Sequence, residues 1–144
     1  MAKTAITING DTRILKRTST ISTFLIDPRK LLSDIGDYLK DEFDKNFPTE
    51  GARLEKKWKP LTVGTIREKA RAGYGGKGIL ERTGKMRKGF EKTTTRREVR
   101  VFNDVDYFKY HQLGTSKMAK RVMITAPKKV KREIVAKIRK EIDL

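Results

Sequence analysis

The sequence predicts an α+β fold, in which a small and mostly antiparallel sheet packs against two helices. Apolar residues recur at four-residue spacing in residues 31–43 and again in residues 130–142, which is typical of amphipathic helices. Residues 98–102 alternate between charged and apolar side chains, as a half-buried strand does. The chain has 144 residues, the size of one ordinary domain, so we treat residues 1–144 as a single domain.

The N-terminal part of the chain, residues 1–27, has the weakest pattern. Residues 5–8 alternate as a short strand would, and residues 9–11 fit a turn. Residues 18–23 are polar and β-branched, which fits a strand or an extended arm. We therefore expect residues 1–27 to form an N-terminal strand or arm.

A long helix is predicted to begin at Asp27-Pro28. Asp27 supplies an N-cap side chain, and Pro28 takes the first helical position, where its missing N–H is no loss. The helical pattern ends near Asn46, before Phe47-Pro48. The apolar stripe of this helix consists of Leu31, Ile35, Leu39 and Phe43.

A second, shorter helix is expected after Thr62, whose hydroxyl fits an N-cap. Its apolar positions are Val63, Ile66 and Ala70. Residues 73–78, Gly-Tyr-Gly-Gly-Lys-Gly, are expected to form a flexible loop. They spell the dinucleotide motif G-x-G-x-x-G, but that motif follows a strand, whereas this segment follows a helical pattern. Lys77 precedes Gly78 rather than Ser or Thr, so a Walker loop is excluded too.

Glycines mark the next boundaries. A turn at residues 83–84 leads into a helical turn that would place Met86 and Phe90 on one face. Residues 107–113 fit a short helix that ends at Gly114.

The C-terminal part is expected to add a strand over residues 121–125 and a helix that Pro127 opens. The apolar stripe of this last helix consists of Ile134, Ile138 and Ile142, with Val130 and Val135 beside it. We expect this stripe and that of the first helix to form the core against the sheet. Hydrophobic residues make up only 36% of the chain, which is lean for a self-sufficient monomer, so part of the chain is expected to order against a partner.

Composition excludes several classes of chemistry. Without cysteine the chain has no disulfide or thiol chemistry, and one histidine does not make a His-rich metal site. No segment has the roughly 20 apolar residues of a membrane span, and residues 1–4 lack the apolar run of a signal peptide. We expect synthesis in a reducing cytoplasm, no membrane, no cofactor and no metal.

The single histidine, His111, is the one residue that invites a catalytic reading, as a general base. It lacks an obvious partner, because only Asp104, Asp106 and Ser116 lie near it in the chain. A packed residue or an interface hydrogen-bond donor is the simpler interpretation. We assign no catalytic residue.

The first helix carries an acidic cluster made up of Asp34, Asp37, Asp41, Glu42 and Asp44. Steps of three and four residues place most of these carboxylates away from the apolar stripe, which is typical of a solvated face. The alternative is contact with a basic surface, for which another copy of this chain is the obvious source.

The net charge of +17 is distributed unevenly. Residues 1–72 hold 15 basic and 10 acidic residues, giving +5, while residues 73–144 hold 20 and 8, giving +12. Residues 117–132 contain seven basic residues and no acid. Such a field attracts polyanions and repels copies of itself. Nucleic acid, an acidic protein surface and anionic lipid all fit.

The basic residues either keep the protein soluble or contact phosphates or an acidic partner. The candidate contacts are Lys85, Arg87, Lys88, Arg96, Arg97, Lys117, Lys120, Arg121, Lys128, Lys129, Lys131 and Arg132. Aromatic residues do not interleave with them as a stacking platform needs, and no DNA-reading motif is present. Any DNA contact should therefore be independent of sequence.

Three segments pair an apolar or aromatic anchor with Gly, Pro or Thr: residues 58–61, 79–84 and 107–115. In this order, over residues 28–143, the chain resembles the Mu-like virion morphogenesis, or tail-completion, proteins of tailed phages. The family-motif residues, which are also the candidate interface residues, are Trp58, Pro60, Leu61, Thr83, Gly84, Tyr107, His111, Gly114 and Thr115. The family often has Arg-x-Phe where this chain reads Arg121-Val122-Met123.

The resemblance implies a structural role without catalysis, at the neck or upper tail of a virion assembled in the host cytoplasm. It implies a ring that joins head and tail and lines the DNA path, with a hexamer favoured and a dodecamer the alternative. Its partners would be copies of itself and neighbouring head-connector and tail proteins. Two other functions remain: a small basic nucleic-acid-binding or nuclease-type protein that acts without sequence preference, and an inhibitor or adaptor that docks on an acidic enzyme.

Overall fold

The computed structural model describes residues 19, 21–22 and 26–142, and it confirms the predicted α+β class. The helices of the described part are α2 (Arg29–Asn46), α3 (Val63–Arg71), α4 (Lys85–Lys88), α5 (Phe108–Leu113) and α6 (Lys128–Glu141). The strands β1 (Phe90–Thr94) and β2 (Val99–Asn103) form an antiparallel hairpin, in register from Phe90 opposite Asn103 to Thr94 opposite Val99. None of the helices in this part of the chain is long and apolar enough to cross a membrane.

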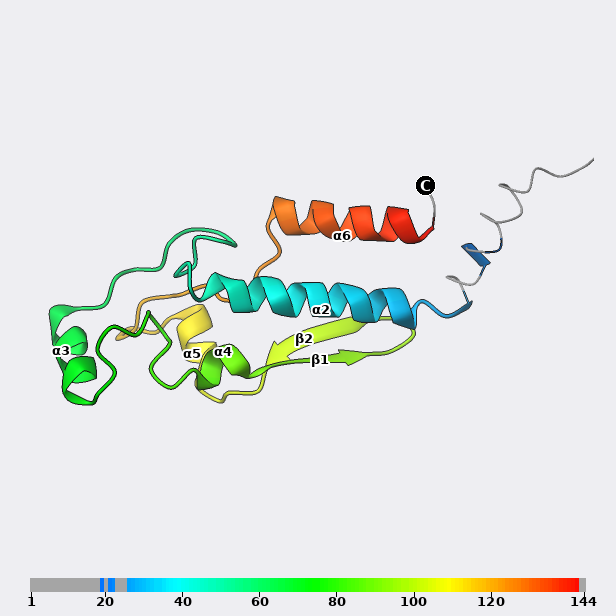
Figure 1. Cartoon of the computed structure of the whole chain (residues 1–144). Coiled ribbons are helices and arrows are strands. Elements are labelled where there is room, and N and C mark those ends of the chain that lie inside the picture. The colour runs from blue at the N-terminus through cyan, green and yellow to red at the C-terminus, as the bar shows by residue number, and fades with distance from the viewer. Residues whose placement is uncertain (1–18, 20, 23–25, 143–144) are drawn as a thin grey trace, which may run out of the picture.

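Helix α2 is the central element of an elongated molecule (Figure 1). The hairpin lies along one side of α2, and α6 runs antiparallel to α2 on the other side. Helix α3 lies at one end of the molecule, and the β1–β2 turn lies toward the other end. The expectation that the first helix packs on the sheet is confirmed. The last helix was expected on the sheet too, and this was wrong, because α6 packs on α2 instead.

The start of α2 differs by one position from the prediction. Pro28 occupies the N-cap and its carbonyl oxygen accepts a hydrogen bond from the Leu32 N–H at 2.9 Å. Asp27 stands just before it, and its Oδ1 accepts a hydrogen bond from the Arg29 N–H at 3.2 Å. The carboxylate therefore still satisfies one of the free N–H groups of the first turn.

Strand β1 was not predicted from the sequence, because its alternation of apolar and polar residues is weak. Its inward positions are Phe90, Lys92 and Thr94, so a lysine stands where an apolar residue would reveal a strand. The Lys92 ammonium reaches α2, where it donates to Ser33 Oγ at 2.7 Å and pairs with Asp37. Gly36 makes this close packing possible, because a Cβ there would lie 2.6 Å from Val99 Cγ2.

The core is largely aromatic. The Phe90 ring lies 5.6 Å from Phe43, 6.1 Å from Phe47 and 5.9 Å from Phe108, measured between ring centroids. Phe47 also packs edge-on against Trp58 at 5.5 Å. On the predicted α2 stripe Leu31, Ile35 and Phe43 are buried and Leu39 is partly buried. Met86 is buried too, as expected, although Phe90 belongs to β1 rather than to the α4 turn.

The apolar stripe of α6 is only partly in the core. Val130 is fully buried at 1% exposure, and Ile134 packs against the core from its edge. Ile138 and Ile142 are half-buried and lie outside the core, while Val135 is 45% exposed. The expectation that Ile138 and Ile142 are core residues was therefore wrong, because only the first turns of α6 lie against the aromatic cluster.

The strand expected over residues 121–125 does not form. Hydrogen bonds from side chains hold this extended segment, in place of the backbone hydrogen bonds that a neighbouring strand would make. Gln112 Oε1 accepts hydrogen bonds from the N–H groups of Met123 at 2.7 Å and Ile124 at 3.1 Å, and Gln112 Nε2 donates to the Ile124 carbonyl at 2.8 Å. The Val122 carbonyl accepts from Asn46 Nδ2 at 3.2 Å and Trp58 Nε1 at 2.9 Å. We call these contacts the side-chain clasp.

The N-terminal expectations fall mostly outside the described residues. This holds for the strand over residues 5–8 and the turn over residues 9–11. Within residues 18–23, Ser19, Ile21 and Ser22 are helical, so a strand is wrong at these three positions.

A candidate docking groove where the sequence motifs meet

Four chain segments and one face of α3 enclose a groove with a volume of about 760 Å³. One wall comes from residues 59–62 and from the α3 side chains Thr65, Glu68 and Lys69. The other walls come from the segments around Leu80 and Tyr107, and from residues 117–121. A concave site of this size is in the range that holds a ligand or a short peptide segment.

The groove brings together family-motif residues from all three segments. Pro60, Leu61, Thr83, Tyr107 and His111 line it. Segments that are about 50 residues apart in the sequence therefore form one surface, a convergence that the linear pattern did not reveal. The remaining motif residues, Trp58, Gly84, Gly114 and Thr115, support the walls from outside.

Trp58 is a core residue at 4% exposure. Its indole Nε1 takes part in the side-chain clasp, and its ring covers Gly51, where any Cβ would lie within 3.0 Å of the indole. Gly51 has a φ of +94°, which favours glycine in its own right. This tight turn fixes the start of the groove wall at residues 59–62.

Gly114 and Thr115 fold the chain back after α5. Gly114 has a φ of +78°, and a Cβ there would lie 2.9 Å from the Lys120 nitrogen. Thr115 Oγ1 accepts hydrogen bonds from the N–H groups of Lys117 at 3.3 Å and Met118 at 3.0 Å. The Arg121 N–H then donates to the His111 carbonyl oxygen at 2.8 Å, which brings residues 117–121 beside α5.

Thr83 and Gly84 set the start of α4. Thr83 Oγ1 accepts a hydrogen bond from the Lys85 N–H at 3.4 Å, and Gly84 is left-handed with a φ of +72°. Leu80, on the groove wall, also has a positive φ of 63°. A leucine rarely adopts this conformation, and such strain occurs preferentially at functional positions.

The electrostatics of the groove centre on Arg121 and His111. Arg121 is 8% exposed and its Nη2 donates to the Lys59 carbonyl oxygen at 3.2 Å, while its buried Nε has no hydrogen-bond partner. Burial lowers the pKa of Arg121. The pKa of His111 is lowered as well, by burial and then by the Arg121 charge, so the ring favours its neutral form. Its buried Nδ1 is likewise without a partner.

The loop over residues 73–78 has a definite path beside the groove. The Tyr74 N–H donates to the Lys69 carbonyl oxygen at 2.8 Å, and Lys69 Nζ donates to the carbonyl oxygens of Lys77 and Gly78 at 2.8 and 2.9 Å. The Arg82 guanidinium lies 4.9 Å from the Tyr74 ring centroid. The loop follows α3 rather than a strand, which agrees with the rejection of a dinucleotide site.

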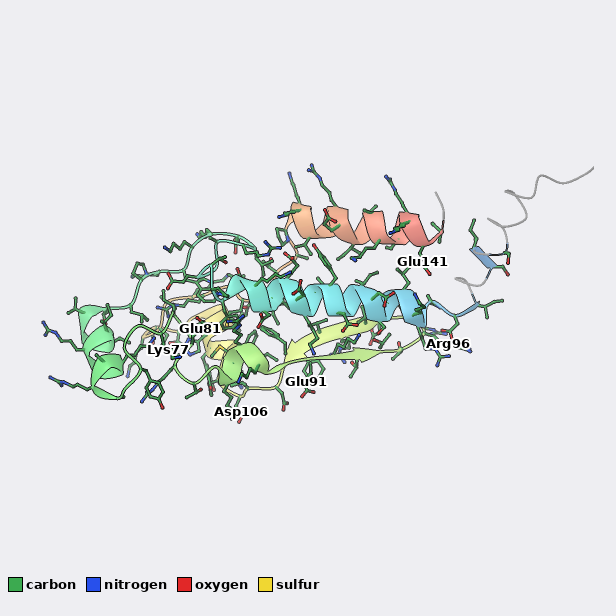
Figure 2. All side chains as sticks on the ribbon, viewed as in Figure 1. Lys77, Glu81, Glu91, Arg96, Asp106 and Glu141 are labelled. Carbon is green, nitrogen blue, oxygen red and sulfur yellow. The ribbon has the colours of Figure 1, made fainter. Side chains whose placement is uncertain are left out.

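The candidate basic contacts are not gathered on one face. Arg96 and Arg97 lie at the β1–β2 turn, far from α3, as Figure 2 shows for Arg96. The others occupy α4, the groove rim and the first turns of α6. Most of these side chains are exposed. Arg121, in contrast, is buried at the groove wall.

Arg87 is engaged inside the molecule. Its Nε lies 2.7 Å from Asp44 Oδ1, and its Nη1 lies 3.0 Å from Glu81 Oε1. These contacts raise the pKa of Arg87, and the hydrogen bond from Arg87 lowers the pKa of Asp44. The charge of Arg87 is therefore neutralised within the chain.

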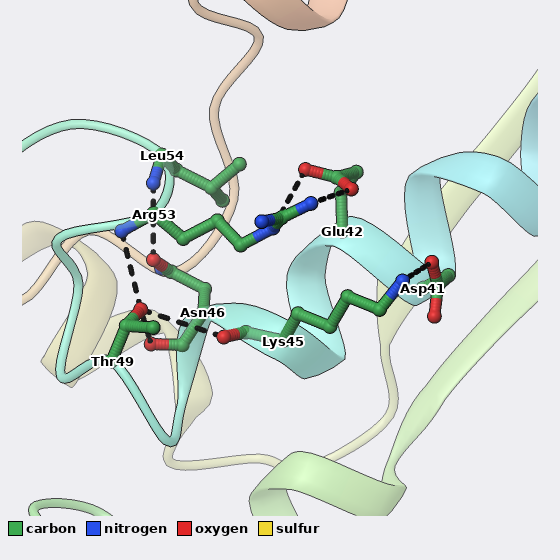
Figure 3. Close-up of polar contacts among 7 residues, drawn as sticks. All are labelled: Asp41, Glu42, Lys45, Asn46, Thr49, Arg53 and Leu54. Atoms are coloured by element: carbon green, nitrogen blue, oxygen red, sulfur yellow. Dashed lines mark hydrogen bonds and ion pairs between the residues drawn. The ribbon is translucent and has the colours of Figure 1, made fainter.

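The acidic cluster on α2 is also satisfied within the chain. The pairs are Asp34 with Lys30, Asp37 with Lys92, Asp41 with Lys45, Glu42 with Arg53, and Asp44 with Arg87. Figure 3 shows Glu42, 4% exposed, held by Arg53, next to the buried Asn46, whose Oδ1 accepts from the Leu54 N–H at 3.3 Å. Each acid of the cluster therefore has a cationic partner within its own chain.

Helix α3 is oriented opposite to an ordinary surface helix. Thr62 caps it as predicted, accepting a hydrogen bond from the Thr65 N–H at 3.3 Å. Its polar residues Thr65 and Lys69 face the groove, whereas Val63 is 63% exposed and Ile66 is 54% exposed. None of the residues of α3 is buried. The apolar stripe was recognised in the sequence, but its orientation toward solvent was not.

Helix α5 adds further exposed apolar area. Tyr107 at its N-cap, Tyr110 and Leu113 are 41%, 47% and 72% exposed. Their three-residue spacing places them along one stripe of the helix. Together with α3, this stripe is the part of the described surface that most resembles an unfilled interface.

Comparison with known proteins gives one match. The model of the phage virion morphogenesis family matches residues 10–141, nearly the whole chain. No curated protein and no solved structure shows significant similarity to the chain. The match agrees with the resemblance of the motif segments that line the groove, and it reaches further toward the N-terminus. The chain belongs to the phage virion morphogenesis family and has a role in the structure or assembly of phage particles.

Proposed function

We propose that this protein forms a ring at the neck or upper tail of the phage particle and joins head to tail. The observation that carries the proposal is the inverted orientation of α3, which turns Val63 and Ile66 to solvent. An amphipathic helix that exposes its apolar stripe has a surface to bury against another molecule. A neighbouring copy is the simplest source of that surface in a ring.

Cyclic symmetry requires two different surfaces on each copy. The exposed face of α3 is one, and the Tyr107–Leu113 stripe of α5 is available as part of the other. We favour a hexamer, with a dodecamer as the alternative. The isolated protein is expected to remain monomeric, because a charge of +17 on each copy opposes closure until an acidic neighbour or DNA neutralises it.

The outer face of α6 fits the DNA path or an acidic neighbouring ring. Lys128, Lys129, Lys131 and Arg132 are all exposed, and the helix directs nitrogen-tipped side chains away from α2 (Figure 2). These residues form no ion pair among the described residues. Contact with phosphates through such lysines and arginines does not depend on DNA sequence.

Introducing charge on α3 tests the ring. The double variant Val63→Asp/Ile66→Asp should fold normally, because both side chains are exposed, but copies should no longer associate. Phages that carry it are expected to yield full heads and separate tails in electron micrographs, and infectivity should fall by several orders of magnitude. Val135→Asp on α6 is the matched control, an apolar residue of similar type at 45% exposure, and it should leave α3-mediated assembly intact.

A second experiment tests the basic outer face of α6. Changing Lys128, Lys129, Lys131 and Arg132 to Glu should also leave heads and tails unjoined. Normal infectious particles from both variants, or particles that lack the protein altogether, would contradict the ring and its position. Steep salt-dependent binding of DNA by the monomer, together with normal joining by the α3 variant, would instead support the simple nucleic-acid-binding function.

A further inference from the structure

Arg121 is a charged group that the fold buries without giving it a counterion. Arg121 is 8% exposed, and its side chain donates one hydrogen bond, to the Lys59 carbonyl oxygen. Every carboxylate of the α2 cluster pairs with another cation, and none of the ion pairs of the described residues includes Arg121. A buried guanidinium that keeps unmet donors is costly, unless a partner supplies an anion.

The surroundings of Arg121 restrict the kind of anion. The groove has apolar and aromatic lining residues in Pro60, Leu61, Tyr107 and Met118. Its charged lining is mainly positive and consists of Lys59, Lys69, Arg82, Lys117 and Arg121, with Glu68 as the single acid. A duplex presents its phosphates on a broad convex surface that does not enter a groove of this size. A carboxylate on a peptide does enter, because its flanking side chains can cover the apolar walls while the carboxylate meets the Arg121 guanidinium where that residue lines the groove.

From this arrangement we infer that the groove binds a segment of a neighbouring particle protein that carries an aspartate or glutamate between apolar residues, and that the carboxylate pairs with Arg121. This inference rests on the proposed function, since it needs a neighbour in the particle, and it names the chemistry of that neighbour. A second copy of the chain fits less well, because its charge is +17 and the acids of its α2 are already paired.

His111 has a supporting place in this site. Its buried Nδ1 lies on the same wall without a hydrogen-bond partner, and its ring packs edge-on against Tyr107 at 6.2 Å. A neutral His111 adds no charge beside Arg121. The docking segment therefore meets a buried arginine next to a tyrosine, two residue types that are enriched at the energetic centres of protein interfaces.

The test uses the full-length protein and a display library of twelve-residue peptides with blocked ends. Selection on the wild-type chain should enrich peptides with an acidic residue flanked by apolar ones. Adding the best synthetic peptide should shift the NMR signals of Arg121 Nε–Hε and of the His111 ring. Replacing the acidic residue of that peptide by its amide should weaken binding by at least about thirtyfold.

Variants of the chain give the matching evidence. Arg121→Gln should weaken binding of the acidic peptide at least about thirtyfold, whereas Arg100→Gln, at an exposed position of β2, should not. Tyr107→Ala, which removes a 41% exposed wall residue, should also weaken binding and keeps the test open if Arg121→Gln does not fold. Val63→Asp/Ile66→Asp should bind the peptide normally, so loss of the ring and loss of the groove are separate results.

Other outcomes would overturn the inference. Selected peptides without an acidic residue, or peptide-induced shifts confined to α6, would mean that the groove is not the docking site. Competition for Arg121 by a short duplex DNA or by inorganic phosphate at low concentration would mean that the site takes phosphate. Concentration-dependent shifts of the Arg121 signal in the protein alone would mean that a second copy occupies the groove.

Discussion

Replacing Phe47 with alanine is expected to lower the free energy of unfolding by about 3–5 kcal/mol. Phe47 is fully buried, with its ring 5.5 Å from Trp58 and 6.1 Å from Phe90, so its removal opens a cavity between α2, the Trp58 loop and the hairpin. Domains of ordinary size are stable by about 5–15 kcal/mol, so this loss is a large part of the total. Urea unfolding followed by circular dichroism and by the fluorescence of Trp58 measures it.

The control for Phe47→Ala is a second aromatic truncation. Tyr110→Ala removes a side chain of similar size that is 47% exposed, and it should change the free energy of unfolding by less than about 0.5 kcal/mol. Equal midpoints for the two variants would mean that the aromatic cluster is not the centre of the core.

The second large effect is expected from Gly51→Ala, which should cost about 2–5 kcal/mol. One contribution is the left-handed backbone at a φ of +94°, worth about 1–2 kcal/mol for a residue with a Cβ. The other is overpacking of about 1–3 kcal/mol, because the new methyl would overlap the Trp58 indole and lie 2.8 Å from the Lys56 carbonyl oxygen. The displaced indole should also change its fluorescence.

Gly76→Ala separates the two contributions. Gly76 has a similar φ of +76°, but a Cβ there meets nothing within 4 Å. Its substitution should therefore cost only the conformational share, about 1–2 kcal/mol. If Gly51→Ala and Gly76→Ala destabilise the protein equally, the contact between Gly51 and Trp58 does not restrict this position.

The sequence predicted those elements whose burial follows a simple period. Helix α2 was recognised because Leu31, Ile35 and Phe43 face one core, and β2 because its apolar residues alternate. Strand β1 escaped because Lys92 takes an inward position and satisfies its charge on α2. A strand was predicted over residues 121–125, but the side chains of Asn46, Trp58 and Gln112 bind the backbone of this segment instead.

The candidate site was only partly predictable. The motif residues were identified in the sequence, and the turns at Gly84 and Gly114 follow from glycine chemistry. The groove itself depends on long-range packing that brings Pro60, Thr83 and Tyr107 together. The spacing of apolar residues predicts on which side of a helix they lie, but it does not predict whether that side faces the core or the solvent. The outward orientation of Val63 and Ile66 was therefore visible only in the structure.

The side-chain clasp around Val122 has a consequence for folding kinetics. Two of its hydrogen bonds, from Asn46 and Trp58 to the Val122 carbonyl oxygen, join residues 76 and 64 positions apart, so the loops that they close must be ordered before these bonds can contribute. We expect these two bonds to form after the main folding barrier. Asn46→Ala should then accelerate unfolding in stopped-flow experiments and leave the folding rate nearly unchanged, whereas slower folding would indicate that they form early. On this expectation, the wall of the groove that carries Arg121 forms after the aromatic core and opens before it.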